Sequence, residues 1–180
     1  MEDYSFFQSW LSGEVTEEIL DDDLGRVSDG VLSEFRCFKE EGLVRIPKYM
    51  SFVEAASLPC AALTAWSGII ELGSIKPGQN VLIQGTGGVS LFAMQFAIMA
   101  GASVIVTSSN NKKIKILQDM GIKRTINYKE NPEWGMEVLD ITDGKGVDHV
   151  MEVGGAGTLK QSIRAVKPGG IISIVGVLDG

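Results

Sequence analysis

Short apolar runs alternate with longer amphipathic segments over the second half of the chain. Runs of apolar and β-branched residues, typical of strands buried on both faces, cover residues 81–84, 104–107, 125–128, 147–153 and 171–175. The segments between them have helical length and cover residues 89–100, 112–120, 132–142 and 158–166. Five strands that alternate with helices predict an α/β fold with an open parallel sheet.

Glycines punctuate this pattern. Gly101 and Gly121 follow two of the predicted helices, where a glycine commonly ends a helix. Residues 143–146 and 167–170 have the composition of turns, and the second turn leads into the predicted strand 171–175. Residues 89–106 are nearly apolar enough for a membrane span, but Gly101 falls where a helix would stop. The strand–helix–strand interpretation is therefore preferred.

The first part of the chain has a different pattern. Residues 31–38 and 43–46 read as strands joined by a turn at 39–42. Ser51 and Glu54 have the spacing of a capping box, which predicts a helix limited by Pro59. A second helix is predicted over 61–72 and ends at Gly73. The sequence thus predicts a β-rich remnant of a separate domain (1–50), connecting helices (51–75) and a sheet domain (76–180).

Charge and cysteine content narrow the classes of function. The 180 residues carry a formal net charge of −7, which argues against nucleic acid or an anionic membrane as the main partner. Cys37 and Cys60 form neither a disulfide framework nor a CxxC pair, and the N-terminus lacks a signal-peptide pattern. A cytoplasmic protein that acts on a small-molecule substrate is expected.

The turn after the first strand of the sheet domain carries the most specific chemistry. Gly85-Thr86-Gly87-Gly88-Val89-Ser90 nearly fits GxGxxG, with Ser90 at the third glycine position. Small residues let the turn leave the strand sharply and let the backbone approach a diphosphate, which the helix N-terminus then holds. Because a strand precedes the turn and a helix follows, nucleotide binding is favoured over a structural turn and over a methyltransferase cofactor loop.

The end of the second strand favours one nucleotide. An NAD site usually offers Asp or Glu about 20 residues past the motif. Here residues 107–113 read Thr-Ser-Ser-Asn-Asn-Lys-Lys, and no carboxylate precedes Asp119. Hydroxyls, amides and two ammonium groups suit a 2′-phosphate better than a bare ribose, which favours NADP(H) over NAD(H). The alternative is that Lys112 and Lys113 only solvate the start of a surface helix.

The chain resembles the medium-chain dehydrogenase/reductases, in particular their zinc-type alcohol-dehydrogenase-like and quinone-oxidoreductase-like members. The resemblance is carried by the segments FVEAASLPCAALTAW (52–66), IKPGQNVLIQGTGGVSLFAMQFA (75–97), INYKE (126–130), GVDHVMEVGG (146–155) and VKPGGIISIVGVL (166–178). It implies a Rossmann-type sheet joined to a partial GroES-like β-rich remnant at the N-terminus. It also implies dimers formed through the edge of the sheet, so a homodimer is expected.

The resemblance also implies roles for individual residues. Thr86, Gly87, Gly88 and Val89 would hold the diphosphate, and Ser108, Lys113 and Tyr128 would surround the adenosine 2′-phosphate. The nicotinamide would be lined by Thr64, Gly154, Gly155, Gly176 and Val177. Simpler alternatives are that Thr64 caps a helical turn and that Tyr128 only packs at a strand end. No proton donor is identified, so the catalytic residues stay unknown.

A zinc ion is not expected. Cys60 falls where zinc-dependent members of the family place one metal ligand, but a catalytic zinc takes three protein ligands, and Cys60 has no evident partners. We therefore interpret Cys60 as a small buried helix residue. His149 is the only histidine and lies within a predicted strand, which indicates a core or strand-edge imidazole.

Chains of this family are longer at both ends, so the resemblance implies that the sequence is a fragment. Most of the GroES-like barrel would precede Met1, and a sixth strand would follow Gly180. Residues 171–175 would then present an unpaired apolar edge. Three functions remain open: an oxidoreductase that passes hydride between nicotinamide and a carbonyl, alcohol, activated alkene or quinone; a non-catalytic nucleotide-binding or interaction module; or a product with little stable fold.

Overall fold

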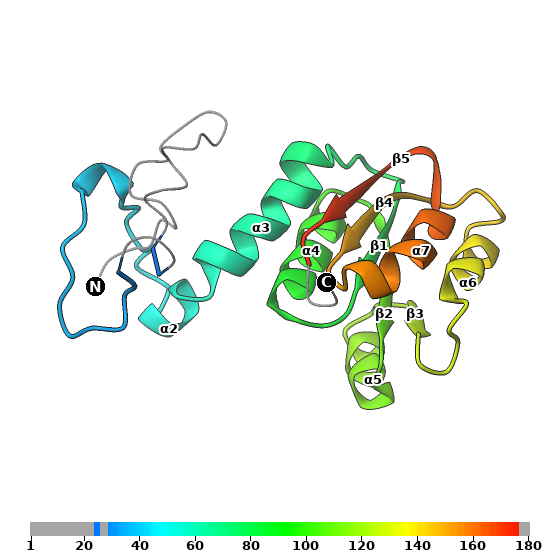
Figure 1. Ribbon diagram of the computed structural model, residues 1–180, viewed down its shortest axis with the longest axis horizontal. Coiled ribbons are helices and arrows are strands. Elements are labelled where there is room, and N and C mark those ends of the chain that lie inside the picture. The colour runs from blue at the N-terminus through cyan, green and yellow to red at the C-terminus, as the bar shows by residue number, and fades with distance from the viewer. Residues whose placement is uncertain (1–23, 26–28, 177–180) are drawn as a thin grey trace. The chain divides into compact units, whose positions relative to one another are not determined.

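The structure is a computed structural model that describes residues 24–25 and 29–176 (Figure 1). The chain divides into two compact units, Met1–Cys60 and Ala61–Gly180. Each unit is described by itself below.

The second unit contains the predicted parallel sheet (Figure 1). All pairs in its five strands are parallel, and the strands lie in the order β3-β2-β1-β4-β5. Their bounds are Asn80–Gln84 (β1), Ser103–Ser108 (β2), Arg124–Asn127 (β3), Val147–Glu152 (β4) and Val166–Ile174 (β5). The Rossmann-type α/β fold predicted from the periodicity and the resemblance is confirmed, with each strand displaced by a few residues at most except β5.

Four helices cover the two faces of this sheet, and the side chains of β1 point alternately into the core on each face. Val81 and Ile83 belong to the core under α4 and α5, whereas Leu82 belongs to the core under α6 and α7. The helices are Gly88–Met99 (α4), Asn111–Asp119 (α5), Trp134–Ile141 (α6) and Ala156–Ala165 (α7). Burial on both faces explains why the central strand β1 and its neighbour β2 carry no charged residue.

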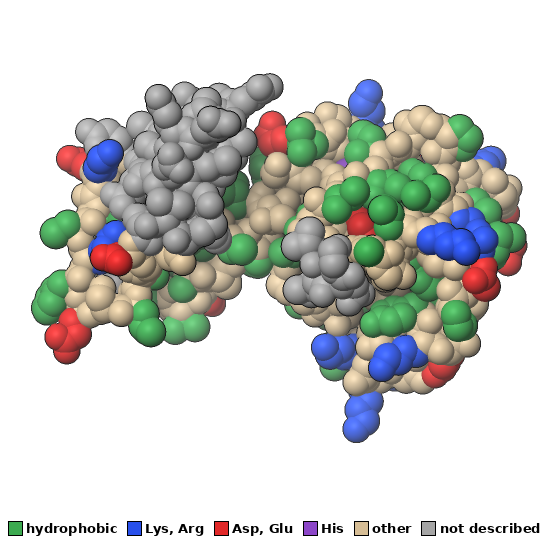
Figure 2. All heavy atoms as spheres, viewed as in Figure 1, with side chains coloured by type: hydrophobic (Ala, Val, Ile, Leu, Met, Phe, Trp, Pro, Cys, Tyr) green, Lys and Arg blue, Asp and Glu red, His purple; other side chains and the backbone are tan. Residues whose placement is uncertain are grey.

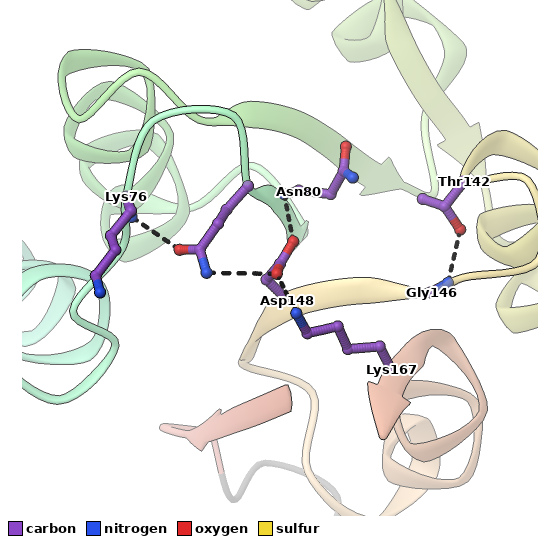
Figure 3. A network of polar contacts seen from close by, with 7 residues as sticks. Lys76, Asn80, Thr142, Gly146, Asp148 and Lys167 are labelled. Atoms are coloured by element: carbon purple, nitrogen blue, oxygen red, sulfur yellow. Dashed lines mark hydrogen bonds and ion pairs between the residues drawn. The ribbon is translucent and has the colours of Figure 1, made fainter. Parts of the chain in front are cut away.

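A polar cluster holds together the edge of the sheet where the strands begin (Figure 3). The Asp148 carboxylate accepts hydrogen bonds from the backbone N–H of Asn80 at 2.8 Å and from Nε2 of Gln79 at 3.3 Å. It also forms an ion pair with Lys167 Nζ at 2.6 Å. Asp148 therefore links the first residue of β1 to the beginning of β5, and Thr142 closes the turn before β4 by accepting from the Gly146 N–H at 3.0 Å.

The sequence predicted a turn at residues 167–170 that precedes the last strand. This prediction is wrong, because β5 already begins at Val166. Val147 pairs with Val166, and His149 pairs with Ile171, so residues 167–170 bulge out of the ladder opposite Asp148 alone. Gly169 has φ +74°, the left-handed conformation that the turn composition suggested. The glycines thus form a bulge inside a strand rather than a turn before it.

A run of helical turns leads into the sheet unit. It comprises α2 (Phe52–Ala55), the π-helix η2 (Leu58–Ala62), α3 (Leu63–Trp66) and the π-helix η3 (Ser67–Leu72). The Ser51–Glu54 capping box is confirmed, and within the second unit Ala65 and Ile69 are fully buried against the core of α4. The stretch Phe52–Leu72 has the length and the mean hydropathy (1.3) of a membrane span. Core helices of soluble proteins share these two properties, so length and hydropathy alone do not identify a membrane span.

In the first unit, the predicted strands 31–38 and 43–46 are wrong. Within residues 29–50, the one regular element is the 3-10 helix η1 (Glu40–Gly42). Leu32, Phe35 and Val44 are exposed there. Their β-branched and aromatic neighbours gave a strand-like pattern, but a strand needs a partner to satisfy its backbone groups, and these residues have none among the described part of the chain.

Candidate nucleotide-binding site

The site lies where β1 and β4 end side by side. From β1 the chain proceeds outward through β2 to β3, and it then crosses back to continue with β4 and β5 on the other side of β1 (Figure 1). In an open α/β sheet, such a reversal leaves a crevice outside the carboxyl ends of the central strands, where ligands bind. Gln84 ends β1 and Glu152 ends β4, one position beyond the pair Ile83–Met151.

The glycine turn after β1 has the geometry of a diphosphate cradle. Gly85 has φ +71°, which a side chain would strain. Gly87 is the N-cap of α4 and provides no side chain to cap the helix, so the first backbone N–H groups of α4 are left for an anion. A Cβ added at Gly87 would have no heavy atom within 4 Å, so the space beside the N-cap of α4 is open. Thr86, Gly87, Gly88 and Val89 all lie at this junction.

Small residues behind the turn bring the helix close to the sheet. Ser90, at the third position of the motif, is buried and its hydroxyl donates to the backbone oxygen of Gln84 at 2.7 Å. A Cβ at Gly88 would lie 3.2 Å from Cβ of Ala61, a tight contact. Ser90 therefore replaces the third glycine without opening the packing, because its hydroxyl has a backbone partner.

Ser108 ends β2, Lys113 follows it in the first turn of α5, and Tyr128 follows β3, the strand that pairs with β2. Ser108 is the last residue of β2, and its hydroxyl accepts a hydrogen bond from the Asn110 N–H at 3.3 Å. Tyr128 follows β3, and its backbone N–H donates to the backbone oxygen of Ser108 at 3.2 Å. Lys113 lies exposed in the first turn of α5, and Figure 2 shows Lys and Arg side chains gathered over this helix. Tyr128 is half-buried and packs on the core below α6, so part of its role is structural.

Asparagines that the sequence interpretation did not single out shape this end of the site. Asn110 caps α5 by accepting from the Lys112 N–H at 2.9 Å and the Lys113 N–H at 3.4 Å. Asn111 accepts from Asn127 Nδ2 at 2.7 Å and donates to Glu130 at 2.6 Å. The position of Asn110 just before a helix was a recognisable signal.

The second missed feature is a buried polar cluster at the end of β4, formed by Gln84, Glu152, Thr158 and Ser162. Glu152 is fully buried and accepts from Nε2 of Gln84 at 2.6 Å. Thr158 and Ser162, both on α7, donate their hydroxyls to the same carboxylate. The sequence signal for this cluster was that two buried strands each end in a polar residue, Gln84 and Glu152. The two residues are far apart in the sequence, so no local spacing shows that they form a pair.

The glycines predicted for the nicotinamide adjoin this cluster. Gly154 and Gly155 donate their N–H groups to Glu152 at 2.9 and 3.1 Å. Gly176 donates its N–H to the Glu152 backbone oxygen at 3.2 Å, and a Cβ on it would overlap the Val153 carbonyl. Val177 lies outside the described residues. Thr64 is half-buried on α3, and among the described residues its hydroxyl has no hydrogen-bond partner, so it does not cap a turn.

His149 and Cys60 have no evident role in this site. His149 is fully buried in β4, an interior strand, where Nε2 lies 2.9 Å from Ser173 Oγ; the strand-edge alternative is therefore wrong. Burial lowers the pKa of His149 to about 4, so the ring is neutral at pH 7. Cys60 is exposed rather than buried, so its interpretation as a small buried helix residue is wrong. The described residues contain no group of three His, Cys, Asp or Glu side chains that could hold a metal ion.

Comparisons with known proteins agree with this geometry. A family model described as zinc-binding dehydrogenase matches residues 88–180. The chain is 45% identical over 174 residues to a zinc-type alcohol dehydrogenase-like protein of Schizosaccharomyces pombe, which covers 96% of this chain and 50% of that protein.

Two solved structures have similar folds. A protein assigned as an alcohol dehydrogenase of Sinorhizobium meliloti 1021 matches with a TM-score of 0.88 and 41% identity over 98% of this chain and 52% of that one. An NAD-dependent alcohol dehydrogenase matches with a TM-score of 0.82 and 35% identity over 92% of this chain and 51% of that one. The chain thus spans about half the length of the proteins that it matches.

Proposed function

This chain belongs to the zinc-binding dehydrogenase family of the medium-chain dehydrogenase/reductases, and from that premise we propose that its second unit is the dinucleotide-binding half of an NADP(H)-dependent oxidoreductase. One observation carries the proposal: a glycine turn with an uncapped helix N-terminus ends the central strand of a sheet with the order β3-β2-β1-β4-β5. That order and that turn together support an anion site at the reversal point of the sheet.

The residues of this chain would bind and orient the cofactor. Backbone N–H groups at Thr86–Val89 would hold the diphosphate, while Ser108 and Lys113, flanked by Tyr128, would hold the adenosine 2′-phosphate. Gly154, Gly155 and Gly176 would line the nicotinamide from the ends of β4 and β5, with Thr64 and Val177 as further lining residues. The bound nicotinamide would supply hydride exchange with a carbonyl, an alcohol, or an activated alkene or quinone.

Gly87 offers a clean test of the cradle. It has φ −79°, which any residue can adopt, and the space in front of it is open, so Gly87→Leu should fold. The new side chain would occupy the place of the diphosphate. We expect the Kd for NADPH, measured by calorimetry, to rise at least about tenfold, while Tm falls by only the modest cost of a poorer N-cap.

Gln95→Leu is the matched control, because it places the same side chain on the exposed face of α4, two turns from its N-terminus. This variant should bind NADPH like the wild type. Unchanged NADPH binding by Gly87→Leu would remove the diphosphate assignment, and with it the proposed function.

The preference for NADP(H) rests on the end of β2. Ser108 carries a hydroxyl there instead of a carboxylate, and Lys113 forms no ion pair with any described residue. NAD(H) is the competing cofactor, since one matched structure is an NAD-dependent enzyme. Lys113→Ala should weaken NADPH binding and leave NADH binding unchanged; equal effects on both would contradict the preference.

A non-catalytic nucleotide-binding module is the second candidate. It is favoured by the lack of a metal-ligand group or an assignable proton donor among the described residues and by the half-length match to the relatives. Turnover of NADPH with a panel of quinones, enals and aldehydes by this 180-residue chain would exclude it. We further propose that the enzyme works in the cytoplasm, as a homodimer and without a catalytic zinc; metal analysis and sedimentation of the purified protein test the last two statements.

A further inference from the structure

Glu152 is a fully buried carboxylate without a cationic partner among the described residues. Five donors surround it instead. Oε1 accepts from the N–H of Gly154 at 2.9 Å, the N–H of Gly155 at 3.1 Å and the hydroxyl of Thr158, and Oε2 accepts from Nε2 of Gln84 at 2.6 Å and the hydroxyl of Ser162. A buried charge is tolerated when its lone pairs are satisfied in this way.

These bonds join three strand ends and one helix. Gln84 is the last residue of β1, Thr158 and Ser162 belong to α7, and Glu152 itself ends β4. The backbone oxygen of Glu152 accepts from the N–H groups of Val175 and Gly176, just after β5, at 2.8 and 3.2 Å. Glu152 therefore links the end of β4 to the end of β1, to α7 and to the residues just after β5.

The turn that Glu152 holds has a backbone conformation that requires glycine. Gly155 has φ +89° and ψ −144°, a region open essentially to glycine alone. Gln84 supports the same turn, because its Oε1 accepts from the N–H groups of Val153 and Gly154 at 3.2 Å each. Without these acceptors, the N–H groups of residues 153–155 would be free to turn toward the crevice.

Glu152 lies on the β4 side of the crevice, and this position determines which half of a bound dinucleotide it can affect. Ser108 and Lys113 lie at the β2 side of β1, and the diphosphate cradle lies at the end of β1 itself. A dinucleotide that places its adenosine at β2 and its diphosphate at β1 must carry its other half over β4 and the turn 153–155. Val153 lies beside the cradle, since its Cγ2 would be 3.9 Å from a Cβ on Gly85.

We propose that Glu152 is a positioning residue for the nicotinamide half of the cofactor, which it serves by fixing the backbone of residues 153–155 and 175–176. The inference rests on the proposed function. Glu152 does not touch the ligand, because both of its oxygens are occupied by donors from the protein. For the same reason it is not the missing proton donor.

The test separates the two halves of the ligand. NADPH contains both halves, whereas 2′,5′-ADP carries only the adenosine and its phosphates. Glu152→Gln keeps the size of the side chain but turns an N–H₂ group toward two donors. We expect the variant of this 180-residue chain to bind NADPH about tenfold more weakly than the wild type, with 2′,5′-ADP bound within about twofold.

Thr158→Val is the milder variant, in case Glu152→Gln does not fold. It removes one donor from the carboxylate, and we expect a smaller loss, about threefold, again for NADPH alone. Thr142→Val is the control: Thr142 is a buried threonine whose hydroxyl donates to the Val138 backbone oxygen at 2.8 Å, but it lies at the opposite edge of the sheet (Figure 3). It should lower Tm without changing either Kd.

Each outcome decides the matter. Weaker NADPH binding with unchanged 2′,5′-ADP binding, in both cluster variants and not in Thr142→Val, supports the positioning role. Parallel weakening of both ligands, or no change in either, overturns it while leaving the proposed function intact. A wild-type chain that binds neither ligand refutes the proposed function, and this inference falls with it.

Discussion

Replacing Asp148 by Asn should expose how the sheet is held where its strands begin. The carboxylate lies between β1 and the β5 bulge, with Lys167 Nζ at 2.6 Å and the Asn80 N–H at 2.8 Å (Figure 3). Its side chain is 15% exposed and that of Lys167 is 40% exposed, so solvent screens the pair only in part. Asn keeps one acceptor oxygen for Asn80 but leaves Lys167 without its ion pair. We expect a loss of about 1–2 kcal/mol at pH 7.

The dependence of this loss on pH follows from the pKa of Asp148. Burial raises this pKa, but the hydrogen bonds from Lys167 and from the Asn80 N–H, together with the charge of Lys167, outweigh burial and hold the pKa below its ordinary value. A carboxyl with a lowered pKa in the fold stabilises the protein above its unfolded pKa, about 3.9, and loses this contribution as the pH falls through the folded value. The difference between wild type and variant should therefore be full at pH 7 and shrink below about pH 4.

The assay is urea unfolding at pH 7, 5 and 3, followed by tryptophan fluorescence, with Tm as a second measure. A loss of 1–2 kcal/mol corresponds to a fall in Tm of roughly 2–8 °C for a chain of this size. Asp119→Asn is the control, because the Lys115–Asp119 pair has the same 2.6 Å separation but side chains that are 70% and 62% exposed, and it should cost only about 0.3–0.5 kcal/mol. Equal losses for the two variants, or an Asp148 penalty that is as large at pH 3 as at pH 7, would refute the reasoning.

Two further predictions concern the sheet interior and the end of β4. Burial holds the pKa of His149 at about 4, so the folded ring stays neutral at pH values where an unfolded ring, with a pKa of about 6.5, gains a proton. As the pH falls from about 6.5 to about 4, the free energy of unfolding should therefore fall by up to about 1.4 kcal/mol per pH unit. His149→Gln should flatten that part of the pH–stability curve, and an unchanged curve would show that His149 is not its source. Gly154→Ala should cost about 1–3 kcal/mol in thermal unfolding, since the new methyl would overlap the Thr158 side chain. Gly87→Ala, with open space around the new methyl, should lower Tm only by the smaller cost of a poorer N-cap. Similar effects of the two alanines would contradict the packing argument.

The helices and strands of the sheet unit were predictable because their signals are local. Alternation in β1 and the glycines after α4 and α5 follow from backbone periodicity and from φ, which depend on a few neighbouring residues. The glycine turn at Gly85–Gly88 was predictable for the same reason, because strand, turn and helix are contiguous. The predictions of strands at residues 31–38 and 43–46 were wrong because the local pattern was present, but no described partner strand completes a ladder with them.

The sequence alone determined the strands and helices of the sheet, the position of the glycine turn and the lack of an acidic residue at the end of β2. Only the tertiary structure decided which residues meet across the crevice. Gln84 and Ser162 are 78 positions apart, and their contact with Glu152 exists because the chain reverses after β3 and lays β4 beside β1. The bulge at 167–170 likewise depends on Asp148 of the neighbouring strand. Strand order and register are set by burial and pairing between distant segments, and no local spacing records them.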